Sequence, residues 1–138
     1  HCSFVERGGP WPEHCVAGTA GAEFSSGLER APGDVVMSKA TRLDREAYSA
    51  LDGTQLADEL QRAGVHRIFV GGLATDYCVR ATGLDERTAG REIVVLRDAG
   101  CAVNVQPGSG ENALVELAAA GADFATTGEV LASLEASP

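Results

Sequence analysis

From residue 34 onwards the sequence alternates short apolar runs with stretches of helical periodicity. The apolar runs lie at 34–38, 67–70, 92–96 and 122–125, and helical patterns follow at 56–63, 79–89, 109–120 and from Thr127. Short apolar runs bounded by turn residues are typical of buried strands, and strands alternating with helices form right-handed βαβ units. We therefore predict an α/β fold with a parallel sheet covered by helices on both faces.

Capping residues predict where two of these helices begin. Asp52, followed three residues later by Gln55, is typical of the N-cap of the helix that ends before Gly64. Ser109 is predicted to cap the helix that ends at Gly121.

Residues 1–33 differ from the rest because glycine and proline interrupt any regular pattern. A loop of this length is uncommon in a compact domain and is often functional. We predict one domain over residues 1–138, in which a metal- and substrate-binding loop (1–33) precedes βα units (34–138).

Composition disfavours several classes of function. A formal charge of −9, from 11 basic and 20 acidic side chains, repels nucleic acids and anionic membranes. The sequence has neither an apolar run of membrane-spanning length nor a secretory signal, so a cytoplasmic protein is expected. The cysteines at 2, 15, 78 and 101 form no CxxC pair and are predicted to be reduced.

The stretch VGGLATDYCV (70–79) brings Cys78 from the end of a strand to the start of a helix. The unpartnered amides and peptide dipoles of a first helical turn favour the thiolate, which is the nucleophilic form. Lys39 also follows an apolar run, and ligands bind beyond the carboxyl ends of parallel strands. We predict Cys78 as a nucleophile with Lys39 as its electrostatic partner. The alternatives are an inert buried cysteine and, for Lys39, a solvated surface charge.

Other polar residues of the sequence are weaker candidates. His1 and His14 lie in the glycine-rich loop but do not by themselves predict a metal site. Asp76 is predicted to accept backbone amides, and Asp98 to have a structural role in a turn. The glycines before Cys78 match neither a P-loop nor GxGxxG, so no nucleotide cofactor is predicted.

Three passages together resemble the nicotinamidases of the isochorismatase-like cysteine hydrolase superfamily. They are HCSF with GGPWPEHCVAGTAGAEF, then SKATRLDREAYSAL, then VGGLATDYCVRAT, and the likeness continues through IVVLRDAGCAV. The resemblance implies a three-layer α/β/α fold with a mostly parallel sheet. It also implies hydrolysis of nicotinamide to nicotinate and ammonia through a cysteine thioester, a reaction of NAD salvage.

The resemblance further implies catalytic roles for individual residues. Cys78 corresponds to the nucleophile and Lys39 to the lysine of an Asp-Lys-Cys triad. The amides of Ala74 and Cys78 would form the oxyanion hole. The family has a cis peptide bond between the residues matching Leu73 and Ala74, and both are expected to contact the substrate.

Metal and substrate contacts are implied in the same way. His1 and His14 correspond to two of three histidine ligands of a Zn²⁺ or Fe²⁺ ion that holds the pyridine nitrogen. Trp11 would form a wall against the pyridine ring, with Tyr48 nearby. The expected partner is a small carboxamide, and homo-oligomer formation is left open.

The resemblance places several family features upstream of the residue matching His1. These are the first strand with the catalytic aspartate, the first helix, the second strand and an Asp-x-His pair of metal ligands. We therefore expect the given chain to be the C-terminal three-quarters of such an enzyme and to be inactive alone.

Two alternatives remain beside nicotinamide hydrolysis. The chain could act on another small amide or ureide within the same superfamily, or it could be a non-catalytic binding module of the same fold. True isochorismatase activity is disfavoured, because that type of enzyme does not use the cysteine matching Cys78.

Overall fold

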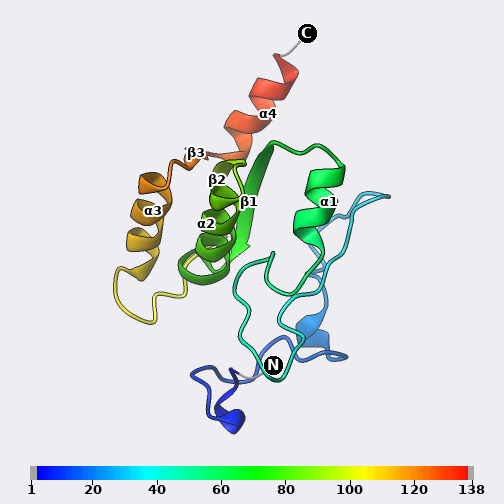
Figure 1. Ribbon diagram of the computed structural model, residues 1–138, viewed down its shortest axis with the longest axis vertical. Helices are drawn as coiled ribbons and strands as arrows, with labels where there is room; N and C mark the ends of the chain where they lie inside the picture. Colours follow the sequence, from blue (N-terminus) through cyan, green and yellow to red (C-terminus); the bar gives the residue numbers. More distant parts are fainter. Residues whose placement is uncertain (1–2, 137–138) are drawn as a thin grey trace. The chain divides into compact units, whose positions relative to one another are not determined.

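The computed structural model describes residues 3–136 and consists of two compact units, 1–47 and 48–138. The second unit contains a three-stranded parallel sheet in the order β1-β2-β3. Its strands are β1 (Arg67–Leu73), β2 (Glu92–Cys101) and β3 (Asp123–Ala125). The predicted α/β class with a parallel sheet is therefore confirmed (Figure 1).

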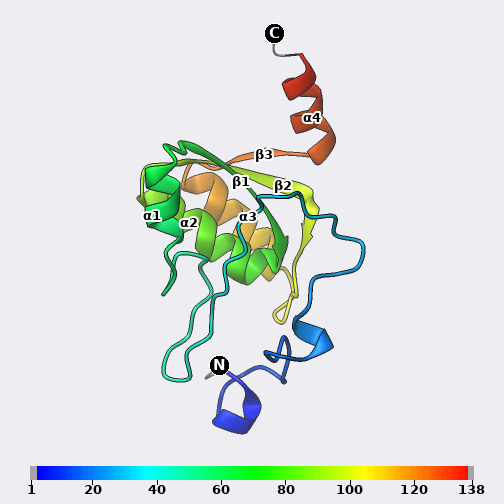
Figure 2. The ribbon, with the colours of Figure 1, turned by 90° about the vertical axis from the view of Figure 1, so that its right-hand side faces the viewer.

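Helices alternate with these strands along the chain. They are α1 (Leu56–Arg62), α2 (Arg80–Thr88), α3 (Ser109–Ala119) and α4 (Thr127–Glu135), and a π-helical turn, η3 (Thr75–Val79), joins β1 to α2. Figure 2 shows α2 and α3 side by side on one face of the sheet, whereas α4 extends from the end of β3. Among residues 3–136 no helix is long and apolar enough to cross a membrane.

The hydrophobic core lies between the sheet and the helices α2 and α3. Its buried members are Val79, Ile93, Val95, Leu117 and Ala122. Leu117 of α3 is completely buried, and a Cβ atom on Gly83 of α2 would lie 2.6 Å from its Cδ2. Glycine at position 83 therefore allows α2 to approach α3 closely.

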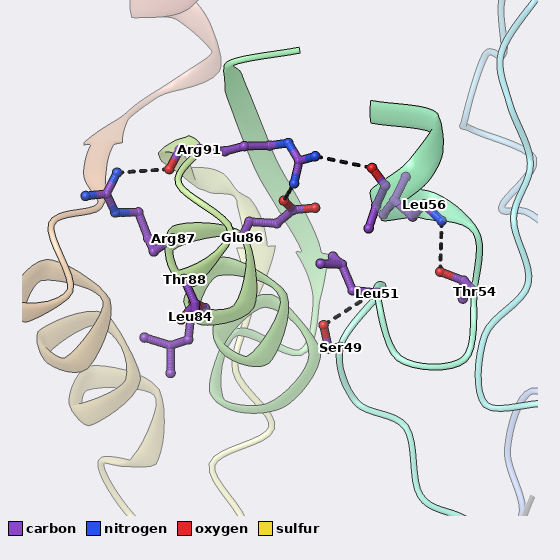
Figure 3. A network of polar contacts seen from close by, with 10 residues as sticks. Ser49, Leu51, Thr54, Leu56, Leu84, Glu86, Arg87, Thr88 and Arg91 are labelled. Carbon is purple, nitrogen blue, oxygen red and sulfur yellow. Dashed lines mark hydrogen bonds and ion pairs between the residues drawn. The ribbon is translucent and has the colours of Figure 1, made fainter. Parts of the chain in front are cut away.

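A polar network lies at the C-terminal end of α2 (Figure 3). Glu86 is only 1% exposed, and its Oε2 lies 2.6 Å from Nη1 of Arg91. Nη2 of Arg91 donates a hydrogen bond to the Ala57 carbonyl at 3.2 Å. The ion pair thus links α2 to the residue before β2, and the hydrogen bond links that residue to α1. The Oε1 atom of Glu86 has no partner among the described residues.

The strand predicted at 34–38 is wrong. These residues have no regular secondary structure, and the side chains of Val35 and Val36 are 79% and 54% exposed. An apolar run becomes a strand only when a neighbouring strand supplies its hydrogen bonds, and no described segment pairs with this one.

Two predicted helix starts also need correction. The N-cap of α1 is Gln55 rather than Asp52, and the Thr54 hydroxyl accepts the Leu56 amide at 3.2 Å. The N-cap of α3 is Gly108, and Ser109 is the first helical residue. The Ser109 side chain does not cap its own helix because its hydroxyl donates to Asp76 instead.

The predicted start of the last helix is confirmed. Thr126 is the N-cap of α4, which begins at Thr127, and the Thr126 hydroxyl accepts the Glu129 amide at 3.2 Å. The Glu129 carboxylate accepts the Thr126 amide at 2.7 Å in return, which completes a capping box.

Candidate active site

Cys78 lies in η3, the turn that follows β1, and it stands two residues before the start of α2. The Ala74 carbonyl accepts the amides of both Tyr77 and Val79 at 3.1 Å, and the second bond spans five residues and closes the π-helical turn. Cys78 is half-buried. It therefore stands at the start of a helical segment at the carboxyl end of a strand, as predicted from the sequence.

The turn that carries Cys78 is held on both sides. Val79 packs in the hydrophobic core and is 4% exposed. Asp76 is 8% exposed, and its carboxylate accepts the amides of Val103 and Asn104 at 3.0 and 2.9 Å and the Ser109 hydroxyl at 2.6 Å. Asp76 accepts backbone amides as predicted, but these belong to the segment between β2 and α3.

These hydrogen bonds determine the charge of Asp76. Burial raises the pKa of this carboxyl, whereas the hydrogen bonds from Ser109, Val103 and Asn104 lower it, and the net pKa lies below the ordinary value. Asp76 is therefore an anion at neutral pH, and its role is to accept hydrogen bonds rather than to supply a proton.

The peptide bond between Leu73 and Ala74 is cis, as the resemblance implied. Ala74 is 8% exposed and Leu73 is 75% exposed, so only Ala74 is buried. The oxyanion-hole role of the Ala74 and Cys78 amides stays a prediction, as do the substrate contacts of Leu73 and Ala74.

An aromatic pair adjoins the turn in the same unit. The rings of Tyr48 and Tyr77 have centroids 5.3 Å apart with an interplanar angle of 46°. Tyr77 directly precedes Cys78, so this pair links the predicted substrate residue Tyr48 to the turn of the predicted nucleophile. The sequence prediction missed Tyr77; its position next to Cys78 was the available signal.

The first unit positions Trp11 and His14 around Phe4. The Trp11 amide donates to the Ser3 carbonyl at 3.0 Å, and the Val5 amide donates to the Trp11 carbonyl at 2.7 Å. The ring of His14 lies edge-on to the rings of Phe4 and Trp11, with centroid distances of 5.3 and 6.5 Å. The loop is therefore ordered by its own backbone and ring contacts.

Gly9 makes this loop possible. A Cβ atom at position 9 would lie only 2.1 Å from the carbonyl carbon of Ser3. The GGPWP sequence therefore folds back over Ser3 because it has glycine at the crossing point.

The hydrogen bonding of His14 fits a metal ligand. Its Nδ1 lies 2.8 Å from the Pro12 carbonyl oxygen, so Nδ1 carries the proton and Nε2 is the ring nitrogen with a lone pair for a metal. His1 lies outside the described residues. Across residues 3–136 no cluster of three histidine, cysteine or acidic side chains could hold a metal ion.

Lys39 belongs to the first unit and Cys78 to the second. Lys39 is half-buried, and its Nζ donates a hydrogen bond to the Ala47 carbonyl at 3.2 Å. Its pairing with Cys78 stays a prediction.

Asp98 has a structural role, but it lies within β2 rather than in the predicted turn. Its carboxylate accepts the amide and the hydroxyl of Thr127 at 2.8 and 2.5 Å, at the start of α4. The hydrogen bond from the Thr127 hydroxyl and, to a smaller extent, the one from its amide hold the pKa of Asp98 below its ordinary value.

Comparisons with known proteins agree on one family. Residues 1–129 match the model of the isochorismatase domain. A nicotinamidase of Escherichia coli (strain K12) is 35% identical over 122 residues, which cover 84% of this chain and 57% of that protein.

Solved structures give the same picture. The pyrazinamidase of Pyrococcus horikoshii in complex with zinc has a TM-score of 0.81 at 48% identity, covering 91% of this chain and 68% of that one. PnC1 from L. infantum in complex with nicotinate has a TM-score of 0.85 at 38% identity, covering 93% of this chain and 66% of that one.

The chain spans only 57% of the length of the curated E. coli relative.

Proposed function

Because the chain belongs to the isochorismatase domain family, we propose that it carries the active-site residues of an amidohydrolase that converts nicotinamide to nicotinate and ammonia. The observation that carries this proposal is the placement of Cys78 in a turn at the carboxyl end of β1, fixed by Val79 and Asp76. The similarity to a nicotinamidase and to a structure with bound nicotinate supports this choice of substrate.

The reaction begins with attack of the Cys78 thiolate on the amide carbon. A C–S bond forms, and the carbonyl oxygen becomes the oxyanion of a tetrahedral intermediate, which the Ala74 and Cys78 amides stabilise. Collapse of this intermediate breaks the C–N bond, and the leaving nitrogen takes a proton to depart as ammonia. Water then hydrolyses the thioester to nicotinate and regenerates the Cys78 thiol.

Lys39 contributes electrostatically. As the resemblance implies, an ammonium group beside the thiol would stabilise the negative charge of the nucleophile. This role is carried over from the resemblance and adds to the effect of the helix start on Cys78.

The proton for the departing amine needs a separate donor. Asp76 and Asp98 both have lowered pKa values and use their oxygens to accept hydrogen bonds, so neither is suited to give a proton. We assign this role to the aspartate that the resemblance places upstream of His1.

His14 is proposed as one ligand of a divalent metal, with His1 as a second. The lone pair on Nε2 of His14 and the zinc complex of the P. horikoshii relative support this assignment. When bound, such a metal would act as a template for the pyridine nitrogen. Trp11 and Tyr48 are proposed to contact the pyridine ring.

Ammonia release tests the proposed function. A chain that includes the upstream aspartate is assayed with nicotinamide, pyrazinamide and a carbamoyl substrate, as wild type and as Cys78→Ala. We expect the two pyridine- or pyrazine-type carboxamides to be preferred and Cys78→Ala to abolish turnover. A preference for the carbamoyl substrate would favour the ureide alternative, and no turnover of any substrate by a chain that includes the upstream aspartate would favour the binding module.

The need for the upstream aspartate is tested with the same assay. The 138-residue chain alone is expected to release little ammonia. Robust turnover by this chain, abolished by Cys78→Ala, would contradict the requirement for that aspartate while supporting the role of Cys78.

A further inference from the structure

Asp76 connects the turn of Cys78 to a distant part of the chain. The amide of Val103 donates to its Oδ1, and the amide of Asn104 and the hydroxyl of Ser109 donate to its Oδ2. These donors lie 27, 28 and 33 residues away in the sequence. Both carboxylate oxygens are therefore used to hold the segment 102–109 against η3.

The segment 102–109 is itself folded tightly onto the start of α3. Asn104 has a left-handed backbone conformation, with φ of +53°, and its Oδ1 accepts the Gly110 amide at 2.9 Å. A Cβ atom on Gly110 would lie 2.4 Å from the Cβ of Ala102. The segment is thus an ordered support for Asp76 rather than a loosely packed loop.

We propose that Asp76 is a positioning residue for Cys78. Asp76 and Cys78 share one π-helical turn, in which Val79 fixes one side through the core and Asp76 fixes the other through the segment 102–109. The carboxylate thereby holds the Cys78 thiol in the orientation that nucleophilic attack needs. This inference rests on the proposed function of Cys78.

Asp76→Asn is the informative substitution because it keeps the shape of the side chain. If the new amide nitrogen replaces Oδ2, it faces the amide of Asn104; if it replaces Oδ1, it faces the amide of Val103. Either orientation places two donors against each other. The turn is therefore released on the Asp76 side, whereas Val79 stays in the core.

Asp98→Asn is a matched control. Like Asp76, Asp98 accepts a hydroxyl from the first residue of a helix together with a backbone amide, but that helix is α4 and the turn of Cys78 is not involved. Loss of these bonds should lower the melting temperature without changing the chemistry of Cys78. Ser109→Ala, which removes one of the three donors to Asp76, provides a milder variant that is expected to fold.

Two readouts separate positioning from a merely structural role. The first is nicotinamide turnover, measured in a chain that includes the upstream aspartate. We expect Asp76→Asn to lower kcat by about ten- to a hundredfold with KM changed by less than about threefold, since misplacement of a reacting group by about 1 Å costs that much. The second is the iodoacetamide alkylation rate of Cys78 relative to that of the exposed Cys15, measured well below the melting temperature. We expect this ratio to fall at least about fivefold toward unity because the activation of Cys78 depends on the turn.

The outcomes are distinct. A fall in kcat and in the alkylation ratio with Asp76→Asn, a smaller fall with Ser109→Ala and none with Asp98→Asn would support the inference. A fall in the alkylation ratio in a protein that includes the upstream aspartate but hydrolyses no nicotinamide would support the positioning role and reject the proposed substrate. Unchanged kcat and alkylation ratio in a folded Asp76→Asn or Ser109→Ala protein would overturn the inference.

Discussion

The Ser109 hydroxyl donates a hydrogen bond to Oδ2 of Asp76 at 2.6 Å, which joins the first residue of α3 to the turn that carries Cys78. The same oxygen accepts the Asn104 amide, and Asp76 is only 8% exposed. Because these donors bind the carboxylate anion, the geometry of the turn that carries Cys78 depends on the ionisation of Asp76.

The stability of the protein should therefore depend on pH through Asp76. Its pKa is lower in the folded chain than the value of about 3.9 expected after unfolding, so its stabilising contribution is complete above that value and is lost as the pH falls through the folded pKa. Urea unfolding at pH 7, 5, 4 and 3 should show Asp76→Asn less stable than wild type by about 1–3 kcal/mol at pH 7, with a difference that shrinks below about pH 4.

The remaining pH dependence of Asp76→Asn has other sources. Hydrogen bonds also lower the pKa values of Asp98, through Thr127, and of Glu129, through Thr126. Asp76→Asn should therefore keep part of the acid sensitivity. A stability difference between wild type and Asp76→Asn that stays constant down to pH 3 would contradict the linkage to Asp76.

Glu86 is expected to matter for stability and not for chemistry. It is 1% exposed, and its removal leaves the guanidinium of Arg91 buried without its charge partner (Figure 3). Glu86→Ala should lower the free energy of unfolding by about 3–5 kcal/mol. Urea denaturation monitored by circular dichroism measures this loss.

The ion pair between Arg67 and Glu92 gives a control for Glu86. These side chains are 61% and 58% exposed, and solvent screens their attraction. Glu92→Ala should therefore cost less than about 1 kcal/mol. Equal losses for Glu86→Ala and Glu92→Ala would show that burial does not set the strength of the Glu86–Arg91 pair.

Much of the sheet and its helices could be predicted from local sequence patterns. The apolar runs at 67–70 and 92–96 became β1 and β2, and Thr127 begins α4 as expected. The run at 34–38 had an equally apolar pattern but forms no strand, because strand formation also depends on a partner that local sequence does not specify. The caps of α1 and α3 were misplaced because the Thr54 hydroxyl accepts the first amide of α1 and the Ser109 hydroxyl donates to Asp76.

Within the candidate site, too, local features could be predicted from the sequence and long-range contacts could not. The place of Cys78 at a helix start follows from residues 70–79 themselves, so it could be predicted. The partners of Asp76 lie 27 to 33 residues away, and the contact between Tyr48 and Tyr77 spans the whole of β1, so neither could be read from a short window. Folding brings these groups together, and periodicity gives no information about such distant pairs.

Metal binding should depend on His14. Its Nδ1 is held by the Pro12 carbonyl, so Nε2 is the nitrogen that we expect to ligate a divalent metal. His14→Ala should weaken Zn²⁺ binding at least about tenfold, as measured by competition with a chromophoric chelator.

His66 provides the control for the His14 experiment. Its side chain is exposed and lies just before β1, outside the loop that carries His14. His66→Ala should leave Zn²⁺ affinity unchanged. Equal affinity in His14→Ala and His66→Ala would contradict the assignment of His14 as a ligand.

The central claim, that Cys78 is the nucleophile, is tested most directly by peptide mapping of an acid-quenched reaction between nicotinamide and a chain that includes the upstream aspartate. The experiment compares wild type with the variants Cys78→Ala and Cys101→Ala, and the exposed Cys15 serves as an internal reference thiol. We predict a nicotinoyl thioester on the peptide that contains Cys78. Cys101→Ala should retain this thioester, whereas Cys78→Ala should lose both the thioester and turnover. Undiminished ammonia release by Cys78→Ala would contradict it.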